Sequence, residues 1–332
     1  MAERDAGAQR DSGAEREIGA DTGAPRDTRP ASPRTVETTT VERINARYSC
    51  RTYRNEPLPP DVRERLVAFL ESHSAGPLGS TARFDVVAAA PDDPQALRRL
   101  GTYGFIKGAT GFLVGAVRRG PKDCEDYGYL VEQAILVATG LGLQSCWLGG
   151  TFTKSSFEKR LGGLARGEVM PAVVALGYPG DDGTERIRER EAGRRRLPAS
   201  SLFFDGRFGR PLMLDDDSAA DDASRSADVG TVLEAVRMAP SATNKQPWRL
   251  VRRGRDWHFF LQRSKGYGKG SAIFTLLRLA DLQRVDLGIA MCHFELVARD
   301  LGWHGAWVLA EPADVGPPGP GVEYVVTWRE AS

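Results

Sequence analysis

The sequence contains few cysteines, no long apolar run and almost no net charge. Its four cysteines, Cys50, Cys124, Cys146 and Cys292, lack the Cys-x-x-Cys spacing of a metal or redox site, so we expect reduced thiols in a cytoplasmic protein. Lys and Arg (45 residues) balance Asp and Glu (44 residues), which excludes the strong charge typical of proteins that bind nucleic acid or anionic membranes. No apolar run reaches the roughly 18 residues needed to cross a bilayer, and the N-terminus has no signal-peptide core.

Two segments have almost none of the large apolar side chains that a folded core requires. Residues 1–40 are rich in Ala, Gly, Thr, Pro and charged residues, and such a segment cannot bury enough surface to offset its ordering entropy. We therefore expect a disordered N-terminal extension, which is either dispensable or a functional tail. Residues 214–227 are acidic, small and polar, and are expected to form an interdomain linker.

What the chain does contain is an internal repeat. Residues 126–147 align without a gap on residues 286–307. The identical positions include Asp126/Asp286, Gly128/Gly288, Leu136/Leu296, Val137/Val297, Ala138/Ala298, Leu141/Leu301, Gly142/Gly302 and Trp147/Trp307. A second match lies upstream, where residues 61–66 resemble residues 228–233. A tandem duplication with small insertions explains both matches.

Two copies are too few for a solenoid. We expect instead a single chain folded as an intramolecular pseudo-dimer, with a first repeat at residues 41–213 and a shorter second repeat at residues 228–332. Each repeat would bury its apolar faces against the other, so the chain is expected to be a monomer. Its function is then expected where the repeats meet and where the copies differ.

Helical and extended patterns alternate after Val41 and predict an α+β fold, in which helices wrap a mainly antiparallel sheet. The helical patterns cover residues 61–72, 127–141, 228–238 and 285–301. Short apolar runs predict strands over residues 84–90, 112–117, 171–176, 249–252, 257–262 and 322–328. The segment 127–141 is apolar nearly all round, which predicts a central buried helix.

Two short motifs indicate a bound phosphate and a bound ring. In R-Y-S-C-R, Arg47, Ser49 and Arg51 alternate, and an extended segment would place their side chains on one face, where they can bind a phosphate. A solvated strand face is the alternative. In A-P-S-A-T-N-K-Q-P-W, residues 239–248, short polar side chains and free backbone amides suit the edge of a polar heteroaromatic ring.

With L-G-L-Q-S-C-W-L-G-G at 141–150 and R-R-R-L-P at 194–198, these motifs make the sequence similar to the FMN-dependent nitroreductase family. The similarity covers about residues 41–330. The duplicated arrangement resembles the family's internally duplicated, single-chain branch, the TM-nitroreductase type. The resemblance implies a nitroreductase-like fold with FMN as cofactor.

The resemblance also implies a role for each motif. The residues implied to hold the flavin phosphate and ribityl chain are Arg47, Ser49 and Arg51, with Arg194 and Arg196 of the late basic cluster also reaching the phosphate. The residues implied to contact the flavin ring are Pro240, Ser241, Ala242 and Asn244 from the other half of the site, and Trp147, Leu148, Gly149 and Gly150 beside the central ring nitrogen.

The two copies supply different parts of this site. Where the second copy has P-S-A-T-N, the first reads H-S-A-G-P at 73–77. The second copy lacks R-x-S-x-R, and its Trp307 is followed by V-L-A where Trp147 is followed by L-G-G. We therefore expect one composite site, and one FMN, per chain.

Other features have competing interpretations. G-L-G-L-Q-S from Gly140 resembles a dinucleotide-binding motif but ends a helix, which favours a helix cap. His293 has no neighbours at metal-ligand spacing, so we expect a core or interface histidine and no metal. Lys107 is either a cation beside the flavin's pyrimidine edge or a solvated lysine. Tyr127 and Tyr129 are expected to pack in the core.

The resemblance implies an FMN-dependent oxidoreductase that moves electrons by a ping-pong mechanism from NAD(P)H to a nitroaromatic or quinone-like small molecule. The flavin carries the chemistry, so no catalytic side chain is assigned. One alternative is a flavin-binding or flavin-sequestering protein with little turnover. Another is a specialised enzyme of the same superfamily, which uses reduced flavin for dehalogenation or ring fragmentation.

Overall fold

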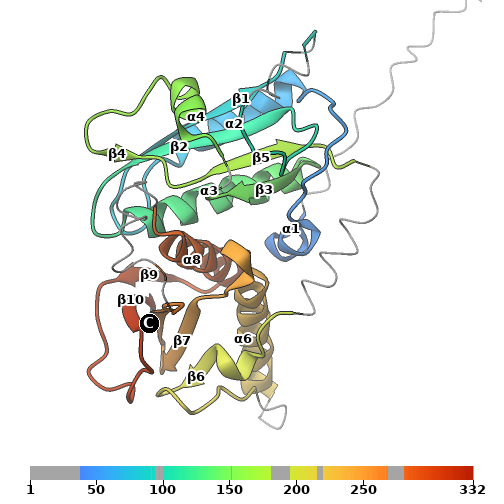
Figure 1. The fold of residues 1–332 in the computed structure, drawn as a ribbon. Coiled ribbons are helices and arrows are strands. Elements are labelled where there is room, and N and C mark those ends of the chain that lie inside the picture. The colour runs from blue at the N-terminus through green and yellow to red at the C-terminus, as the bar shows by residue number, and fades with distance from the viewer. Residues whose placement is uncertain are drawn as a thin grey trace, which may run out of the picture. The chain divides into compact units, whose positions relative to one another are not determined.

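Helices and strands alternate along the chain in the computed structural model, from which two five-stranded sheets are built (Figure 1). The structure describes residues 38–90, 92–93, 97, 100–150, 152–180, 195–214, 220–265, 267 and 280–331. Residues 1–37 of the predicted extension lie outside the described residues, and so does Arg194. None of the described helices combines the length and the apolarity needed to cross a bilayer.

The N-terminal half, from α1 to β5, contains the first sheet. Its elements are α1 (Thr40–Ala46), α2 (Pro60–Ser72), β1 (Ala82–Ala88), β2 (Gly111–Arg118), α3 (Asp123–Gly140), β3 (Gln144–Leu148), α4 (Lys154–Arg160), β4 (Glu168–Val169) and β5 (Val173–Gly177). The strand order is β1-β2-β5-β3, with β4 also paired to β2, and the neighbouring strands are antiparallel.

The C-terminal half, from α6 to β10, contains most of the second sheet. The elements that follow β5 are η2 (Ala199–Ser201), β6 (Phe203–Asp205), α6 (Ala220–Met238), η3 (Ala242–Asn244), β7 (Trp248–Arg253), β8 (Asp256–Gln262), α8 (Leu282–Asp300), β9 (Gly305–Val308) and β10 (Val322–Glu330). The strand order is β6-β7-β8-β10-β9, parallel only between β6 and β7.

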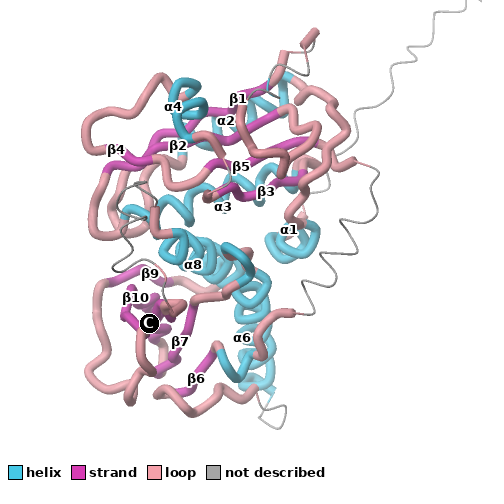
Figure 2. The backbone as a smooth tube through the Cα atoms, viewed as in Figure 1, coloured by secondary structure: helices cyan, strands magenta, loops and turns pink. Residues whose placement is uncertain are grey.

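The two halves share one plan. Without β4 and β6, the first sheet has the strand order β1-β2-β5-β3 and the second has the order β7-β8-β10-β9. In each sheet the first, second, fourth and third strands along the chain thus lie side by side in that order. A long, largely buried helix follows the second strand of this plan in each half, α3 in one and α8 in the other. Figure 2 shows these two helices between the strands of the two sheets. β6 comes from the predicted first repeat yet joins the second sheet.

The helices α3 and α8 pack against each other where each has a glycine (Figure 1). A Cβ atom at Gly288 would lie 1.9 Å from the carbonyl oxygen of Glu125, and one at Gly128 would lie 2.2 Å from that of Val285. The backbones are therefore in direct contact, and only glycine leaves room for it. This explains why the aligned segments 126–147 and 286–307 both contain glycine at the third position.

Both central helices end in the same way. Gly142 and Gly302 have φ of +84° and +78°, and the next residue donates its backbone N–H to a helix carbonyl, from Leu143 to Ala138 and from Trp303 to Ala298. This is a left-handed C-terminal cap. The interpretation of G-L-G-L-Q-S as a helix cap is confirmed.

Some predicted boundaries were wrong. Helix α6 begins at Ala220 and not at 228, so residues 220–227 of the predicted linker are helical. The guanidinium of Arg225 lies 3.9 Å from the ring centroid of Trp303 and pairs with Glu330, and these tertiary contacts stabilise a helical turn that composition alone did not predict. Strands β3 and β9 were also missed, because both are short and follow closely after the end of a central helix.

Candidate functional site

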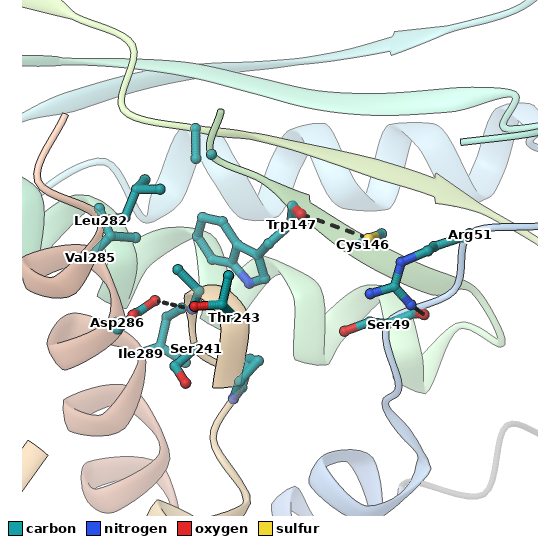
Figure 3. A pocket seen from close by; sticks show the side chains of 14 residues that line it. Ser49, Arg51, Cys146, Trp147, Ser241, Thr243, Leu282, Val285, Asp286 and Ile289 are labelled. Carbon is teal, nitrogen blue, oxygen red and sulfur yellow. Dashed lines mark hydrogen bonds between the residues drawn. The ribbon is translucent and has the colours of Figure 1, made fainter. Parts of the chain in front are cut away.

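A pocket of about 150 Å³ is lined by residues of both halves. Ser49 and Arg51 lie on the segment after α1, and Trp147 and Gly149 lie at the end of β3. The segment 240–243, after α6, and the first turns of α8 complete the lining. Figure 3 shows Trp147 between the side chains of the C-terminal half and those of Ser49 and Arg51.

The loop after α6 has an unusual backbone. Thr243, Asn244 and Gln246 have φ of 52°, 56° and 49°, in the left-handed region that is unfavourable for residues other than glycine. Gln246 holds this conformation: its backbone N–H donates to Ser241 Oγ at 2.9 Å, and its buried side-chain Oε1 accepts from the N–H of Leu197 at 2.8 Å. The loop is therefore fixed before any ligand binds.

An aspartate on α8 also holds this loop. Asp286 is buried and lines the pocket, and its Oδ1 accepts from the N–H of Ala242 at 2.9 Å. Its Oδ2 is buried, and no residue in the described part of the chain forms a hydrogen bond with it. Burial raises the pKa of Asp286 well above its ordinary value, against the opposing effect of the hydrogen bond from Ala242. The protonated form of Asp286 therefore persists to higher pH than that of an exposed aspartate.

A second buried carboxylate holds Trp147. Glu132 on α3 accepts from Trp147 Nε1 at 2.9 Å, while His293 Nε2 lies 3.1 Å from its other oxygen and Arg47 Nε lies 3.9 Å away. Burial opposes the charge, but the hydrogen bonds from His293 and Trp147 and the charge of Arg47 lower the pKa of Glu132 overall. His293 Nδ1 lies 2.8 Å from the carbonyl oxygen of Ala235, so both ring nitrogens face acceptors, which an imidazolium satisfies.

The C-terminal half contains a similar arrangement. Glu295 on α8 accepts from Trp307 Nε1 at 2.5 Å and from Tyr129 Oη at 2.7 Å, and it also pairs with Arg299. Each tryptophan is thus bound by a glutamate of its own half, and each glutamate is contacted by a residue of the opposite central helix. The predictions that His293 is a core or interface histidine and that Tyr127 and Tyr129 pack in the core are confirmed.

Comparison with known proteins identifies the family. Residues 39–298 match the model of the family described as "Putative TM nitroreductase". The chain belongs to this nitroreductase family. The membership predicted from the sequence motifs is thereby confirmed.

One solved structure shows the same nitroreductase-like fold, and a second shows a weaker similarity. A protein from Thermotoga maritima, described as "a putative nitroreductase", aligns with a TM-score of 0.54 and 16% identity over 92% of this chain and 99% of its own. NADPH:FMN oxidoreductase from Vibrio harveyi aligns with a TM-score of 0.39 and 17% identity over 59% of this chain and 86% of its own. A comparison with curated proteins finds no match.

The structure of this nitroreductase-family chain brings together residues from three of the four sequence motifs. The predicted site residues that line the pocket are Ser49, Arg51, Trp147, Gly149, Pro240, Ser241 and Ala242. Leu148 is buried in the core, and neither Gly150 nor Asn244 lines the pocket. Arg47 also lies outside the lining, where its Nε and Nη1 atoms are buried without a hydrogen-bond partner.

Two other predicted residues lie elsewhere. Lys107 pairs through its backbone with the segment 51–53, accepting from Tyr53 N and donating to Arg51 O, and it lines a different cavity together with Leu100 and Phe112. Arg196 donates through Nη1 to Ala239 O at 2.6 Å and through Nη2 to Met238 O at 2.9 Å. These contacts place the guanidinium of Arg196 at the end of α6, next to the loop of the pocket.

The sequence interpretation missed the wall formed by α8. Leu282, Val285, Asp286 and Ile289 all line the pocket, as does Thr243. Their spacing of three, one and three residues puts the four α8 residues on one helix face. The signal was present in the repeat, because Asp286 aligns with Asp126, but identity between copies does not reveal which copy faces a ligand.

Proposed function

We propose that this protein is a cytoplasmic FMN-dependent oxidoreductase of nitroreductase type, which passes electrons from NAD(P)H to a nitroaromatic or quinone-like small molecule. The observation that carries the proposal is the shared pocket, where Ser49 and Arg51 of one half face the segment 240–243 of the other. Membership of the nitroreductase family supports the same reading.

The chemistry of the lining suits a ligand with an anionic end and a planar ring. Arg51 and Ser49 offer a guanidinium and a hydroxyl. The nearby Arg47 has two buried donor atoms that form no hydrogen bond with the described residues, and an anion would satisfy them. On the other side, Val285 and Ile289 offer apolar surface against which a ring can pack. In this proposal Arg47, Ser49 and Arg51 hold the phosphate, while Gly149 and the segment 240–242 contact the ring.

When bound, FMN supplies the capacity to accept a hydride and return electrons to an acceptor. The protein binds and orients it. Trp147 is held by Glu132, and the loop 240–246 is held by Asp286 and Gln246, so both sides of the pocket are set before binding. Such preorganisation lowers the ordering cost of binding.

The test is anaerobic reduction of the purified, flavin-loaded protein by NADH or NADPH, followed by a nitroaromatic compound or a quinone. Rapid bleaching of the yellow chromophore and its return on adding the acceptor are expected. A bound chromophore that is inert to both nicotinamides and acceptors would support a flavin-sequestering protein and contradict the proposed enzyme.

We further propose that the halves arose by tandem duplication and that the monomer is a pseudo-dimer with one FMN. The shared strand order, the glycine pair in α3 and α8, and the paired Glu–Trp contacts support this. We predict about one FMN released per chain on denaturation, measured by flavin absorbance against protein concentration. A ratio near two would contradict the composite site, since the second combination of motifs would then also bind.

Replacing Arg196 by alanine should reduce stability and weaken flavin binding together. The carbonyl oxygens of Met238 and Ala239 would lose their donor, which we expect to lower the free energy of unfolding by about 1 to 3 kcal/mol and to loosen the adjoining loop. Urea unfolding and flavin titration measure the two effects. The exposed neighbour Arg195, replaced by alanine, is the control and should change neither. Weaker flavin binding at unchanged stability would instead support a direct phosphate contact by Arg196.

A further inference from the structure

Asp126 and Asp286 occupy equivalent positions in α3 and α8 but have different partners. Both oxygens of Asp126 accept backbone hydrogen bonds, from Leu78 N and Ser80 N, each at 2.8 Å. In Asp286, Oδ1 accepts from Ala242 N, while Oδ2 is buried and has no hydrogen-bond partner among the described residues. The copies have thus diverged so that one carboxyl oxygen is free in the half where the aspartate lines the pocket.

Among the residues that the structure describes, the charged groups around Asp286 do not provide a counter-ion. No described cation lies within ion-pair distance of Asp286. Asp281, the N-cap of α8, is itself an acid and is paired with Arg263, and its charge further raises the pKa of Asp286. On the packed face of α3, Glu125 is paired with Arg284.

The other described neighbours of Asp286 carry no charge. The loop after α6 contributes the backbone amide of Ala242, and β3 contributes Trp147 to the same pocket. Tyr267 is an uncharged phenol, because burial raises its pKa to about 12.

An ionised carboxylate with one hydrogen bond and no counter-ion is unfavourable in such a place, whereas a protonated carboxyl is neutral and gains a donor. Its Oδ1 can still accept from Ala242, which leaves the proton on Oδ2. Figure 3 shows Asp286 on the same side of Trp147 as Ser241 and Thr243, among the side chains that line the pocket.

We propose that Asp286 is protonated and that its Oδ2 donates a hydrogen bond to a carbonyl oxygen or ring nitrogen of the planar ring bound in the pocket. This inference rests on the proposed function, in which the ring is that of FMN. Asp286 then has two positioning tasks: its Oδ1 holds the loop and its Oδ2 orients the ligand. Deprotonation would place a negative charge beside the acceptor atoms of the ring and weaken binding.

The test compares two variants of Asp286 by flavin titration, with fluorescence quenching as the readout. Asp286→Asn retains an acceptor for Ala242 N and a donor in the place of Oδ2, so we expect affinity within about threefold of wild type. Asp286→Leu loses both, and we expect roughly tenfold to hundredfold weaker binding. Binding by Asp286→Leu as tight as wild type, or by Asp286→Asn as weak as Asp286→Leu, would overturn the proposal.

Infrared spectroscopy distinguishes a direct contact between Asp286 and the bound ring from a purely structural role of Asp286. The wild type should show the carbonyl stretch of a protonated carboxyl that shifts when FMN is added and is absent from Asp286→Asn. Asp126→Asn is the control: because Asp126 does not line the pocket, that variant should keep the shifting band and the wild-type affinity. A band that is absent, or unmoved by FMN, would overturn the inference.

The pH dependence follows from the same group. Burial raises the pKa of Asp286, so the protonated form persists above the ordinary range, and wild-type affinity should fall only at the pH where the carboxyl band disappears. Asp286→Asn should not show this fall. If wild-type protein binds no FMN at any pH, the proposed function fails as well; if it binds FMN without the band shift, only the role of Asp286 fails.

Discussion

Replacing Gly288 by alanine should lower the free energy of unfolding by about 2 kcal/mol or more, although alanine is the better helix former by about 1 kcal/mol. The added Cβ would lie 1.9 Å from the carbonyl oxygen of Glu125 and 2.9 Å from the amide nitrogen of Tyr129. Both are backbone atoms of α3, so the helices must separate for the methyl group to fit. Urea unfolding followed by tryptophan fluorescence measures the effect.

Two further variants test whether the loss of stability comes from the contact between α3 and α8. Gly128→Ala places the same methyl group on α3, 2.2 Å from the carbonyl oxygen of Val285, and should be destabilising to a similar degree. Gly120→Ala has no atom within 4 Å of the new Cβ and should change stability by less than about 0.5 kcal/mol. If Gly288→Ala proved as stable as Gly120→Ala, the close contact between α3 and α8 would be contradicted.

Removing the carboxylate of Glu132 should have the second large effect. In Glu132→Ala, the imidazole of His293 and the guanidinium of Arg47 would remain buried without their counter-charge, and Trp147 Nε1 would lose its acceptor. Breaking a buried charged network in this way costs about 3 to 5 kcal/mol. Since Trp147 lines the pocket, flavin binding should weaken as well. Urea unfolding and flavin titration measure both.

The contribution of Glu132 to the free energy of unfolding should depend on pH, with a definite sign. The folded protein lowers the pKa of Glu132, so its stabilising contribution is present above the ordinary glutamate pKa of about 4.3 and is lost as pH falls through the lower folded value. Glu132→Gln should lack this acid-dependent part. The exposed Glu234, paired with Arg237 on α6, is the control, and Glu234→Ala should cost about 0.5 kcal/mol or less. Equal losses from Glu132→Ala and Glu234→Ala would contradict a buried network.

Several structural features were predictable because they depend on local patterns. Helical spacing of apolar residues predicted α2 and α8 closely, and the continuous apolar character of 127–141 identified α3 as a buried central helix. The glycine cap after α3 was predictable because a left-handed residue there requires little more than glycine at the end of a helix. The family was predictable because its motifs are short, contiguous strings.

The site was predictable only in part. The R-x-S-x-R motif gave equal weight to Arg47 and Arg51, but burial beside Glu132 separates them, and that glutamate lies far away in the sequence. R-R-R-L-P suggested two phosphate ligands, yet the described Arg196 contacts the end of α6. In each case a long, flexible cation can reach several partners, and only the packing of distant segments selects one.

The sequence by itself determined the alternation of helices and strands, the repeat, the family and the set of motifs that surround the pocket. The tertiary structure decided which copy of a repeated residue faces that pocket. Asp126 and Asp286 are identical in type and in place within their helices, but one has two backbone donors and the other has one. The difference arises because each helix packs against a loop that is distant in the sequence, residues 78–80 for Asp126 and residue 242 for Asp286. The local sequence around each aspartate does not determine how that loop packs.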